Sequence, residues 1–383
     1  MSAIRPFCLI RIGYLYTSRI GHFAGNTELY CCELDAGINI PETRFMDLFF
    51  VKEKVSNKQL LKMWRRELNF LPAVLLYPIH FLTYFYPNGS AHRVRATTQH
   101  DRDIFNLFDR FPAHLRFTDE EETLGKSRLA DMGINEGDKF ICLNVRDSAF
   151  FPGAAYNYHS YRDCSIDNYV YTAEQLAGLG FTVIRMGVKV NKKLESQSPR
   201  IIDYASNGMR SDFMDIYLGA KCYFTISTSS GWDGIPYIFR RPIAFAPFTP
   251  IGYLFTFSFK YVGIFKHHIL AKEYREMTFE EIFRSGLAYA LTANEFENRG
   301  VHLREPTPEE IWDLVNEMVQ MAESNFEYRN DTNSMQQKLK NCFLEFKKDG
   351  PNGRPLHGEI KSLAGNKFLE TNINLISESY YNA

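Results

Sequence analysis

The chain has 383 residues, a length that allows two domains of ordinary size, each with a core of its own. Its 44 Lys and Arg residues balance 45 Asp and Glu residues, so the net charge gives no indication of a nucleic-acid partner. The seven Cys residues form no CxxC pair and no Cys/His cluster with metal-ligand spacing. This composition argues against a disulfide framework and a structural zinc ion, and it favours the reducing cytosol.

Residues 1–135 are expected to form a first α/β domain. The N-terminus, MSAIRPFCLIRIG, lacks the long apolar region of a secretory signal, and its apolar part is typical of a strand. Two strands and two helices are predicted in this domain, at 7–13, 47–51, 26–36 and 57–68. The charged, turn-rich stretch 116–139 is typical of an inter-domain connection, so we place the end of the domain there.

The stretch SRIGHFAGNTELY (18–30) is expected to form a glycine-containing turn followed by a helix start. Gly21 and Gly25 free the backbone, and Asn26 or Thr27 can cap the helix. His22 and Glu28 are candidate general bases, although a purely structural role is equally open for each of them. The stretch does not match GxGxxG, so NAD binding is not indicated.

A basic helix and an aromatic segment follow each other between residues 52 and 87. Lys and Arg dominate 52–67, and four apolar residues share one helical face, Leu60, Leu61, Trp64 and Leu68. The next segment, 70–87, is rich in aromatic residues, but Pro72, Pro78 and His80 interrupt it, so it is not expected to span a membrane. Two interpretations stay open, docking of 52–87 on an anionic membrane surface and an ordinary helix packed on its own sheet.

Residues 136–330 are expected to form a doubly wound α/β domain. Short apolar, β-branched runs are typical of buried parallel strands and occur at 140–145, 182–187, 200–205, 222–227, 241–246 and 300–305. Helical patterns separate them, and capping boxes are predicted at TFEE (278–281) and TPEE (307–310). Residues 331–383 are predicted to be a helical tail that packs back across the domains.

Polar residues gather where the predicted strands of this second domain end. They are Arg146, Asp147, Arg185, Thr228, Ser229, Ser230, Gly231 and Glu305. Ligands of open parallel sheets bind beyond the carboxyl ends of the strands. Arg side chains can bind a pyrophosphate, the 228–231 turn offers backbone N–H groups, and a carboxylate can accept from ribose hydroxyls. We prefer this anion-binding interpretation to simple capping and salt bridging between loops.

Other motifs are weak. Asp101–Asp103 (DRD) matches the DxD of metal-dependent sugar transferases, but this short pattern arises by chance and is expected to cap a helix. No G-x-S-x-G elbow and no Walker A lysine motif occurs.

Several motifs occur in an order that resembles a known family. They are RIGHFAGNTELY, HLRFTDEEETLG, LNVRDSAF, YHSYRDCSIDNYV, GFTVIRMG, SDFMDIYLGAKCYFTISTSSGWDGIPYIFRRPIAF and REPTPEEIWDLV. Together they resemble a family of predicted glycosyltransferases encoded among bacterial surface-polysaccharide genes, such as those for O-antigen and capsule. The similarity covers roughly residues 7–375, and YRDCSIDNY and VIRMG are its most specific parts.

The resemblance implies the GT-B fold, in which two Rossmann-like domains face each other. The second domain would bind a nucleotide sugar, with Ser229, Ser230 and Gly231 at the diphosphate, Arg146 and Arg185 neutralising its charge, and Glu305 at the ribose. The first domain would bind the acceptor beside Gly21, His22 and Asn26, with His22 or Glu28 as base. The resemblance also implies that no metal or other cofactor is needed.

We therefore expect a cytoplasmic glycosyltransferase, peripheral on the inner face of the membrane, that transfers a sugar to a glycan acceptor linked to a lipid. Two alternatives stay open. A nucleotide-sugar epimerase can share this layout and would turn over the donor alone. A non-catalytic scaffold would bind the donor and organise polysaccharide assembly.

Overall fold

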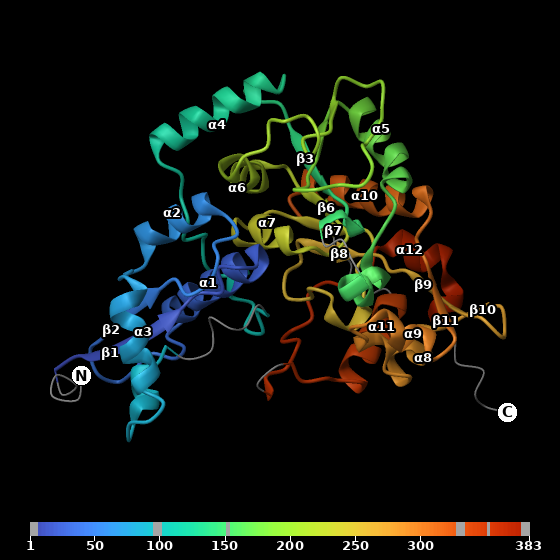
Figure 1. Ribbon diagram of the computed structural model, residues 1–383. Helices are drawn as coiled ribbons and strands as arrows, with labels where there is room; N and C mark the ends of the chain where they lie inside the picture. The colour runs from blue at the N-terminus through green and yellow to red at the C-terminus, as the bar shows by residue number, and fades with distance from the viewer. Residues whose placement is uncertain (1–6, 95–101, 151–153, 327–333, 351–352, 377–383) are drawn as a thin grey trace. The chain divides into compact units, whose positions relative to one another are not determined.

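A computed structural model describes residues 7–94, 102–150, 154–326, 334–350 and 353–376 (Figure 1). Contacts between residues divide the chain into two compact units. Unit 1 contains 1–128, 211–220 and 231–240, and unit 2 contains 129–210, 221–230 and 241–383. Each unit is made of three separate stretches of the chain, whereas the predicted domains 1–135, 136–330 and 331–383 are continuous. The boundaries of these domains stay a prediction.

Unit 1 is built on a parallel strand pair. Strand β1 (Leu9–Tyr14) pairs with β2 (Phe45–Phe50) from Leu9 opposite Phe45 to Tyr14 opposite Phe50. Helix α1 (Ile20–Asp35) connects the two strands. The other helices of this unit are α2 (Lys58–Glu67), α3 (Ala73–Leu82), most of α4 (Asp119–Asp131), α6 (Asp212–Lys221) and α7 (Gly234–Ile238).

Helix α1 is the central helix of unit 1, because all its residues from Phe23 to Glu33 are buried. It packs closely against α7. A Cβ atom on Gly21 would lie 2.7 Å from the backbone oxygen of Gly231, and one on Gly234 would lie 2.9 Å from the Cα of Gly21. Only glycine permits so short a distance between the two backbones.

Helix α2 confirms the helix that was predicted at 57–68. It forms where expected, but its apolar residues Leu60, Met63 and Trp64 are completely buried in unit 1. Two of its basic residues are neutralised by Glu121, whose Oε1 lies 2.9 Å from Nζ of Lys62 and 3.0 Å from Nη1 of Arg66. Hydrogen bonds from Arg66, Lys62, Gln59 and the backbone of Thr118 outweigh burial and lower the pKa of Glu121 to about 2. The α2 helix is therefore an ordinary surface helix.

Unit 2 contains a six-stranded parallel sheet in the order β5-β4-β3-β6-β7-β8. Its strands are β3 (Phe140–Asn144), β4 (Thr182–Arg185), β5 (Ile201–Ile202), β6 (Thr225–Ser227), β7 (Ile243–Phe245) and β8 (Tyr261–Gly263). Numbered along the chain, this is the order 3-2-1-4-5-6 of the Rossmann fold. The predicted α/β class is confirmed, and β3, β4, β6 and β7 are fully buried as expected of a covered parallel sheet.

A second, antiparallel sheet in unit 2 corrects one prediction. Residues 300–305 were expected in the parallel sheet, but β11 (Val301–Arg304) pairs antiparallel with β9 (His267–Leu270). The third strand of this sheet is β10 (Arg275–Glu276). Alternation of apolar and polar residues along β11 does not reveal which strand it pairs with.

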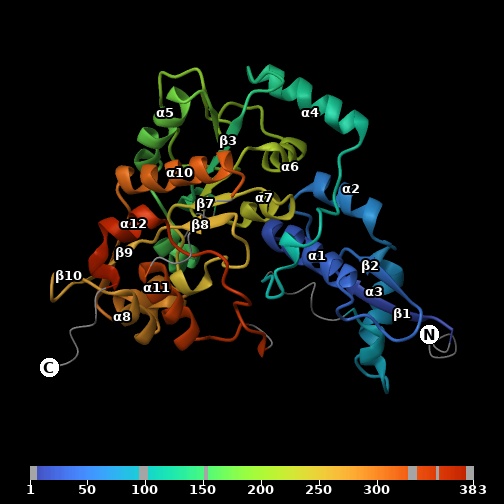
Figure 2. The ribbon, with the colours of Figure 1, turned by 180° about the vertical axis from the view of Figure 1, so that it is seen from behind.

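The remaining helices of unit 2 include α5 (Val170–Gly178), α8 (Phe279–Arg284), α9 (Ala293–Glu297), α10 (Pro308–Glu323), α11 (Ser334–Glu345) and α12 (Asn366–Thr371). Both predicted capping boxes, Thr278 with Glu281 and Thr307 with Glu310, are confirmed. Figures 1 and 2 show α10 alongside α5 and α12, in agreement with their contacts. Among the described residues, no helix has the length and apolar character needed to cross a bilayer.

Candidate functional site

The strand order of the unit 2 sheet reverses between β3 and β6. Strand β3 leads to β4 on one side, while the chain returns to β6 on the other side. In open α/β sheets, the crevice beyond the carboxyl ends of such a strand pair is where ligands bind. Here these ends are Asn144 and Ser227, which pair with each other. The residues that follow them form the candidate donor site.

The hydroxyl residues after β6 join the ends of the two strands. The backbone N–H of Thr228 donates to the backbone oxygen of Asn144 at 3.1 Å, and Oγ1 of Thr228 accepts from the backbone N–H of Arg146 at 2.8 Å. Nδ2 of Asn144 donates to Oγ of Ser230 at 2.6 Å. Ser229 adopts the left-handed conformation, with φ at +64°. Such strain in a non-glycine residue is typical of ligand-binding turns.

Three cationic side chains lie beside these strand ends. Nε of Arg146 lies 3.1 Å from Oδ1 of Asp163, and Nζ of Lys266 donates to the backbone oxygen of Asp163 at 2.6 Å. Nη2 of Arg162 donates to the backbone oxygen of Ser229 and, at 3.1 Å, to its Oγ. Burial raises the pKa of Asp163, although Arg146 and Lys266 oppose the shift. Arg146 thus contacts the carboxylate of Asp163, whereas Lys266 binds the backbone oxygen of the same residue.

Asp147 and Arg185 have structural partners. The Arg185 side chain is only 1% exposed, and its guanidinium lies 3.4 Å from Oδ1 of Asp203 and 3.8 Å from Oδ2 of Asp147. Asp147 also accepts from the backbone N–H groups of Ala149 at 2.9 Å and Asn191 at 2.8 Å. The predicted contact between Arg185 and a phosphate is therefore corrected, because the guanidinium is buried between two carboxylates.

Glu305 also lies elsewhere than predicted. It follows β11, which belongs to the antiparallel sheet, and not a strand of the parallel sheet. Its carboxylate accepts from the backbone N–H of Ser165 at 3.0 Å and from Nδ2 of Asn168 at 2.8 Å. Its observed interactions hold the 3-10 turn Ile166–Tyr169, so the ribose role has no geometric support.

Gly231 does not begin a long helix. It opens a 3-10 turn, Gly231–Asp233, and the α7 helix that follows has five residues and belongs to unit 1. A helix this short has a weak macrodipole, because the dipole sums over aligned peptide units. The turn at 228–231 is therefore not followed by a long helix that could add a dipole to the predicted anion site.

In unit 1, Gly21, His22 and Asn26 lie inside α1 and not in a loop, because the helix begins at Ile20. Gly21 serves the packing of α1 on α7. His22 is half-exposed in the first turn, and its Nδ1 lies 3.3 Å from Oδ1 of Asn26. A tautomer with the proton on Nδ1 would let His22 donate to this amide oxygen.

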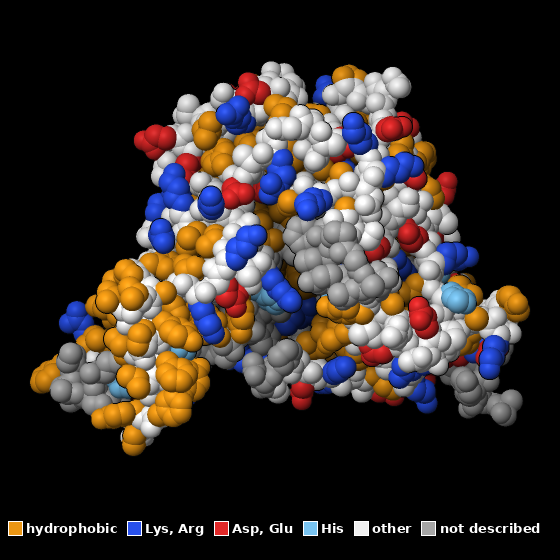
Figure 3. Space-filling model, viewed as in Figure 1, with side chains coloured by type: hydrophobic (Ala, Val, Ile, Leu, Met, Phe, Trp, Pro, Cys, Tyr) orange, Lys and Arg blue, Asp and Glu red, His pale blue; other side chains and the backbone are white. Residues whose placement is uncertain are grey.

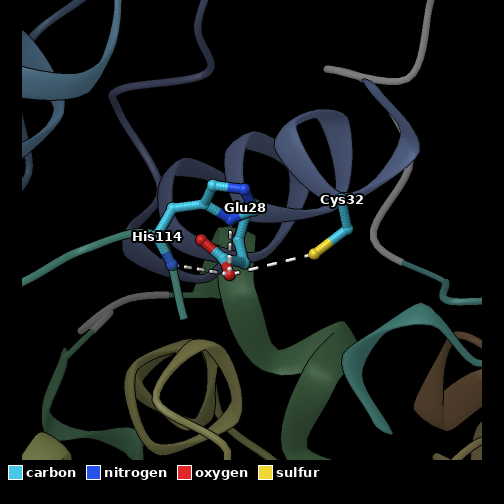
Figure 4. A group of neighbouring side chains, drawn as sticks. All are labelled: Glu28, Cys32 and His114. Atoms are coloured by element: carbon cyan, nitrogen blue, oxygen red, sulfur yellow. Dashed lines mark hydrogen bonds and ion pairs between the residues drawn. The ribbon is translucent and has the colours of Figure 1, made fainter. Parts of the chain in front are cut away.

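Glu28 has a different environment from the one predicted, since it is fully buried in the middle of α1 (Figure 4). Its Oε1 accepts from Nη2 of Arg240 at 2.6 Å and lies 3.1 Å from Nδ1 of His114. Cys32 Sγ lies 3.9 Å from the same oxygen. A carboxylate neutralised by a guanidinium and shielded from solvent is a poor base for an incoming substrate. These contacts favour the structural alternative for Glu28, and its role as catalytic base stays a prediction.

Glu28, Cys32 and His114 have ligand atoms within 4.8 Å of one another, which raises the question of a metal ion. However, Nη2 of Arg240 lies 2.6 Å from Oε1 of Glu28 and 3.4 Å from Sγ of Cys32. A cation between these ligands would have to displace the guanidinium. Burial also raises the pKa of the Cys32 thiol, which disfavours the thiolate that binds metals. In this structure Glu28 contacts both Cys32 and His114, and Arg240 lies where a cation would have to bind.

The structure describes Arg102 and Asp103 of the DRD motif. Asp101 lies outside the described residues. The buried carboxylate of Asp103 accepts from the backbone N–H groups of Leu107 and Phe108, both at 2.8 Å. Asp103 therefore holds the start of the 3-10 turn Leu107–Asp109, and not the α-helix that was expected after the motif.

Sequence reasoning did not single out Arg162, Asp163 and Lys266. Arg162 and Asp163 lie within YRDCSIDNY, so the specificity of that motif was a usable signal. Lys266 lies between β8 and β9 without any motif around it. Only the fold brings it to the candidate site.

The comparisons with known proteins give low similarities. No family model and no curated protein matches the chain. Among solved structures, the E. coli ADP-heptose LPS heptosyltransferase II is 14% identical, with a TM-score of 0.44, over 82% of this chain and all of that one. A glycosyl transferase of family 9 from Veillonella parvula is 10% identical, with a TM-score of 0.39, over 61% of this chain and 79% of that one. A putative UDP-N-acetylglucosamine 2-epimerase from Listeria monocytogenes is 10% identical, with a TM-score of 0.30, over 84% and 97%.

Proposed function

We propose that this protein is a glycosyltransferase of GT-B architecture that transfers a sugar from a nucleotide diphosphate sugar to a surface glycan linked to a lipid. The observation that carries the proposal is the placement of Arg146, Arg162 and Lys266 beside the switch point between β3 and β6. The carboxyl edge of a Rossmann-type sheet, with cationic side chains and a strained hydroxyl turn, suits a nucleotide diphosphate.

In this proposal, the diphosphate lies at Thr228–Ser230, and Arg146 faces it. The Arg146 side chain is 20% exposed, whereas that of Arg185 is buried, so Arg146 is the guanidinium that can reach a ligand. Lys266 supports Asp163 and adds positive charge. Charge accumulates on the diphosphate as the glycosidic bond breaks, and fixed cations stabilise this leaving group.

On the acceptor side, His22 is the proposed base. Its Nε2 would remove the proton from the acceptor hydroxyl while Asn26 holds Nδ1. The proposal involves no metal and no cofactor. It places the protein in the cytoplasm, on the inner face of the membrane.

The test is a thermal-shift panel with UDP, GDP, ADP, CDP, CMP, dTDP and NAD. A nucleotide at 100 times its dissociation constant should stabilise the protein by about 2.7 kcal/mol. We expect one nucleoside diphosphate to raise the melting temperature of the wild type and of Arg284→Ala, but not of Arg146→Ala. Arg284 is a matched control, because it is an exposed arginine paired with Glu280 on α8.

No shift with any nucleotide would contradict the proposal. Once the nucleotide is known, the corresponding sugar donor separates the remaining activities. Conversion of the sugar without an acceptor would indicate an epimerase, whereas binding without turnover in the presence of acceptor glycans would indicate a scaffold.

A further inference from the structure

A large apolar surface is exposed on unit 1. We name residues 71–86, which comprise α3 and the turn after it, the apolar arm. Figure 3 shows hydrophobic side chains gathered over α3. Val74 is 79% exposed, Phe85 71% and Leu82 61%. Other exposed large apolar side chains of the arm are Leu71, Leu75, Tyr77, Ile79, Phe81, Tyr84 and Tyr86. Contiguous exposure of this kind marks an interaction site.

The arm has one face inside unit 1 and another outside. Leu76 and His80 are buried, and Leu76 packs with Ile12 and Phe50 in the core. Six exposed residues lie on the opposite face at helical spacing, Val74, Leu75, Pro78, Ile79, Phe81 and Leu82. A helix that is apolar on its outward face as well as its inward face needs an apolar environment outside the protein.

The charges around the arm favour lipid as that environment. No Asp, Glu, Lys or Arg occurs between Leu68 and His92. At its margin, Nζ of Lys52 lies 5.8 Å from the ring centre of Tyr77, and the Arg93 guanidinium lies 4.2 Å from that of Tyr84. The Lys52 ammonium and the Arg93 guanidinium therefore place positive charge at the edge of the arm. An apolar face with tyrosines and cations at its edge matches the acyl, interfacial and anionic headgroup regions of a bilayer.

Aromatic contacts also connect the arm with the proposed base. Ring centres lie 5.5 Å apart for Tyr84 and His80, 5.8 Å for His80 and Tyr14, 5.7 Å for Tyr14 and Tyr16, and 6.2 Å for Tyr16 and His22. Tyr14, Tyr16 and His22 are half-exposed. Within this aromatic row, Tyr84 is 60% exposed, whereas His80 is buried.

We infer that the apolar arm docks unit 1 on an anionic lipid bilayer. Lys52 and Arg93 contact the headgroups, and the side chains from Val74 to Phe85 enter the interface. If the proposed function holds, the aromatic row leads a lipid-linked glycan from the bilayer to His22. The docking itself requires no transferase activity.

The experiment is flotation of the full chain with vesicles of phosphatidylcholine alone or with 30% phosphatidylglycerol, a composition chosen to supply anionic headgroups. The variant Leu82→Glu/Phe85→Glu changes exposed positions of the arm, so it should fold, which circular dichroism and the melting temperature check. Tyr274→Glu/Ile373→Glu is the matched control, because both residues are exposed apolar side chains of unit 2.

We expect the wild type and the control to float with the anionic vesicles, and the arm variant to lose at least ten-fold in binding. Lys52→Glu should weaken binding to anionic vesicles more than it weakens binding to neutral ones. Wild type that stays unbound, or arm variants that still float, would overturn the inference. A wild-type dimer that the arm variant dissociates, without vesicle binding, would also overturn it and indicate self-association. A nucleotide shift in the thermal panel remains independent of all these outcomes.

Discussion

Arg240 and Glu28 form a buried ion pair between residues that are 212 positions apart in the sequence. The distance from Nη2 to Oε1 is 2.6 Å, and the same guanidinium donates to the backbone oxygens of Phe111 at 3.1 Å and Pro112 at 2.9 Å. Arg240 therefore fixes the end of the α7 segment to α1 and to the 111–112 loop. The pair explains why a carboxylate is found in the middle of a buried helix.

This ion pair predicts a strong effect on stability. Arg240→Met removes the guanidinium partner of the buried Glu28 carboxylate, which should lower the free energy of unfolding by about 3–5 kcal/mol. Adding Glu28→Gln removes the uncompensated charge, so the double variant should recover part of the loss. Urea unfolding of the single and double variants measures this. Additive losses in the double variant would show that the pair is not coupled.

The approach of α1 to α7 predicts a second effect. Gly21→Ala places a Cβ 2.7 Å from a backbone oxygen, and overpacking of this kind should cost about 1–3 kcal/mol. Gly178→Ala is the control, because Gly178 ends α5 and no atom lies within 4 Å of its Cβ position. The control should leave stability unchanged or raise it slightly. Equal unfolding midpoints of the two variants in urea would contradict the packing interpretation.

His267 predicts a pH dependence of stability. Burial alone lowers its pKa, but hydrogen bonds and charge from Glu276 and Glu310 outweigh burial and raise the pKa to about 9. Because the folded-state pKa lies above the ordinary value of 6.5, this contribution is complete below about pH 6.5 and is lost as pH rises through about 9.

Melting curves at several pH values between 6 and 9.5 measure this dependence. Wild type should lose stability over this range, and His267→Gln should be less stable at pH 6 and show a flatter profile. The control His302→Gln changes an exposed histidine on β11 and should keep the wild-type profile. A wild-type slope in His267→Gln would assign the dependence to other groups.

The proposed base predicts an effect on activity. If His22 removes the acceptor proton, His22→Ala should lower kcat by about 10²–10⁴-fold, since positioned proton transfer contributes this much. Donor binding should not change. Asn26→Ala, which removes the partner of Nδ1, should have a smaller effect on kcat. Full activity of His22→Ala with an identified donor and acceptor would eliminate His22 as the base.

The sequence predicted most elements that have a local signal. The strands at 140–145, 182–187, 222–227 and 241–246 were expected close to their observed positions, because buried parallel strands are short, continuous apolar runs. Helix α1 was expected to begin at about 26, whereas it begins at Ile20. Asn26 and Thr27 resemble caps, but Oγ1 of Thr27 donates to the backbone oxygen of Phe23 one turn earlier. The pairing partner of β11 had no local signal.

The candidate site was less predictable than the fold. Arg146 and Thr228–Ser230 were identified because they directly follow buried strands. Arg185 is the last residue of such a strand, yet its guanidinium is buried beside Asp203, and no pattern in the sequence connects the two residues. Lys266, in contrast, was not predicted to lie at the site. The fold brings it to Asp163, which is 103 positions away in the sequence. Patterns identify the ends of strands, but they do not show which charges are already paired.

Unit 1 is assembled from three separate stretches of the chain, so the gene encodes it in three separate parts. Helices α6 and α7 are encoded between the strands of the unit 2 sheet, although they pack in unit 1. A gene fragment that ends at residue 128 would encode α1 without α7, and would leave the buried Glu28 without Arg240. Recombination between related genes at that point would combine an α1 from one parent with an α7 from another. Substitutions at the contact between α1 and α7 are therefore expected to require matching substitutions in two distant parts of the gene.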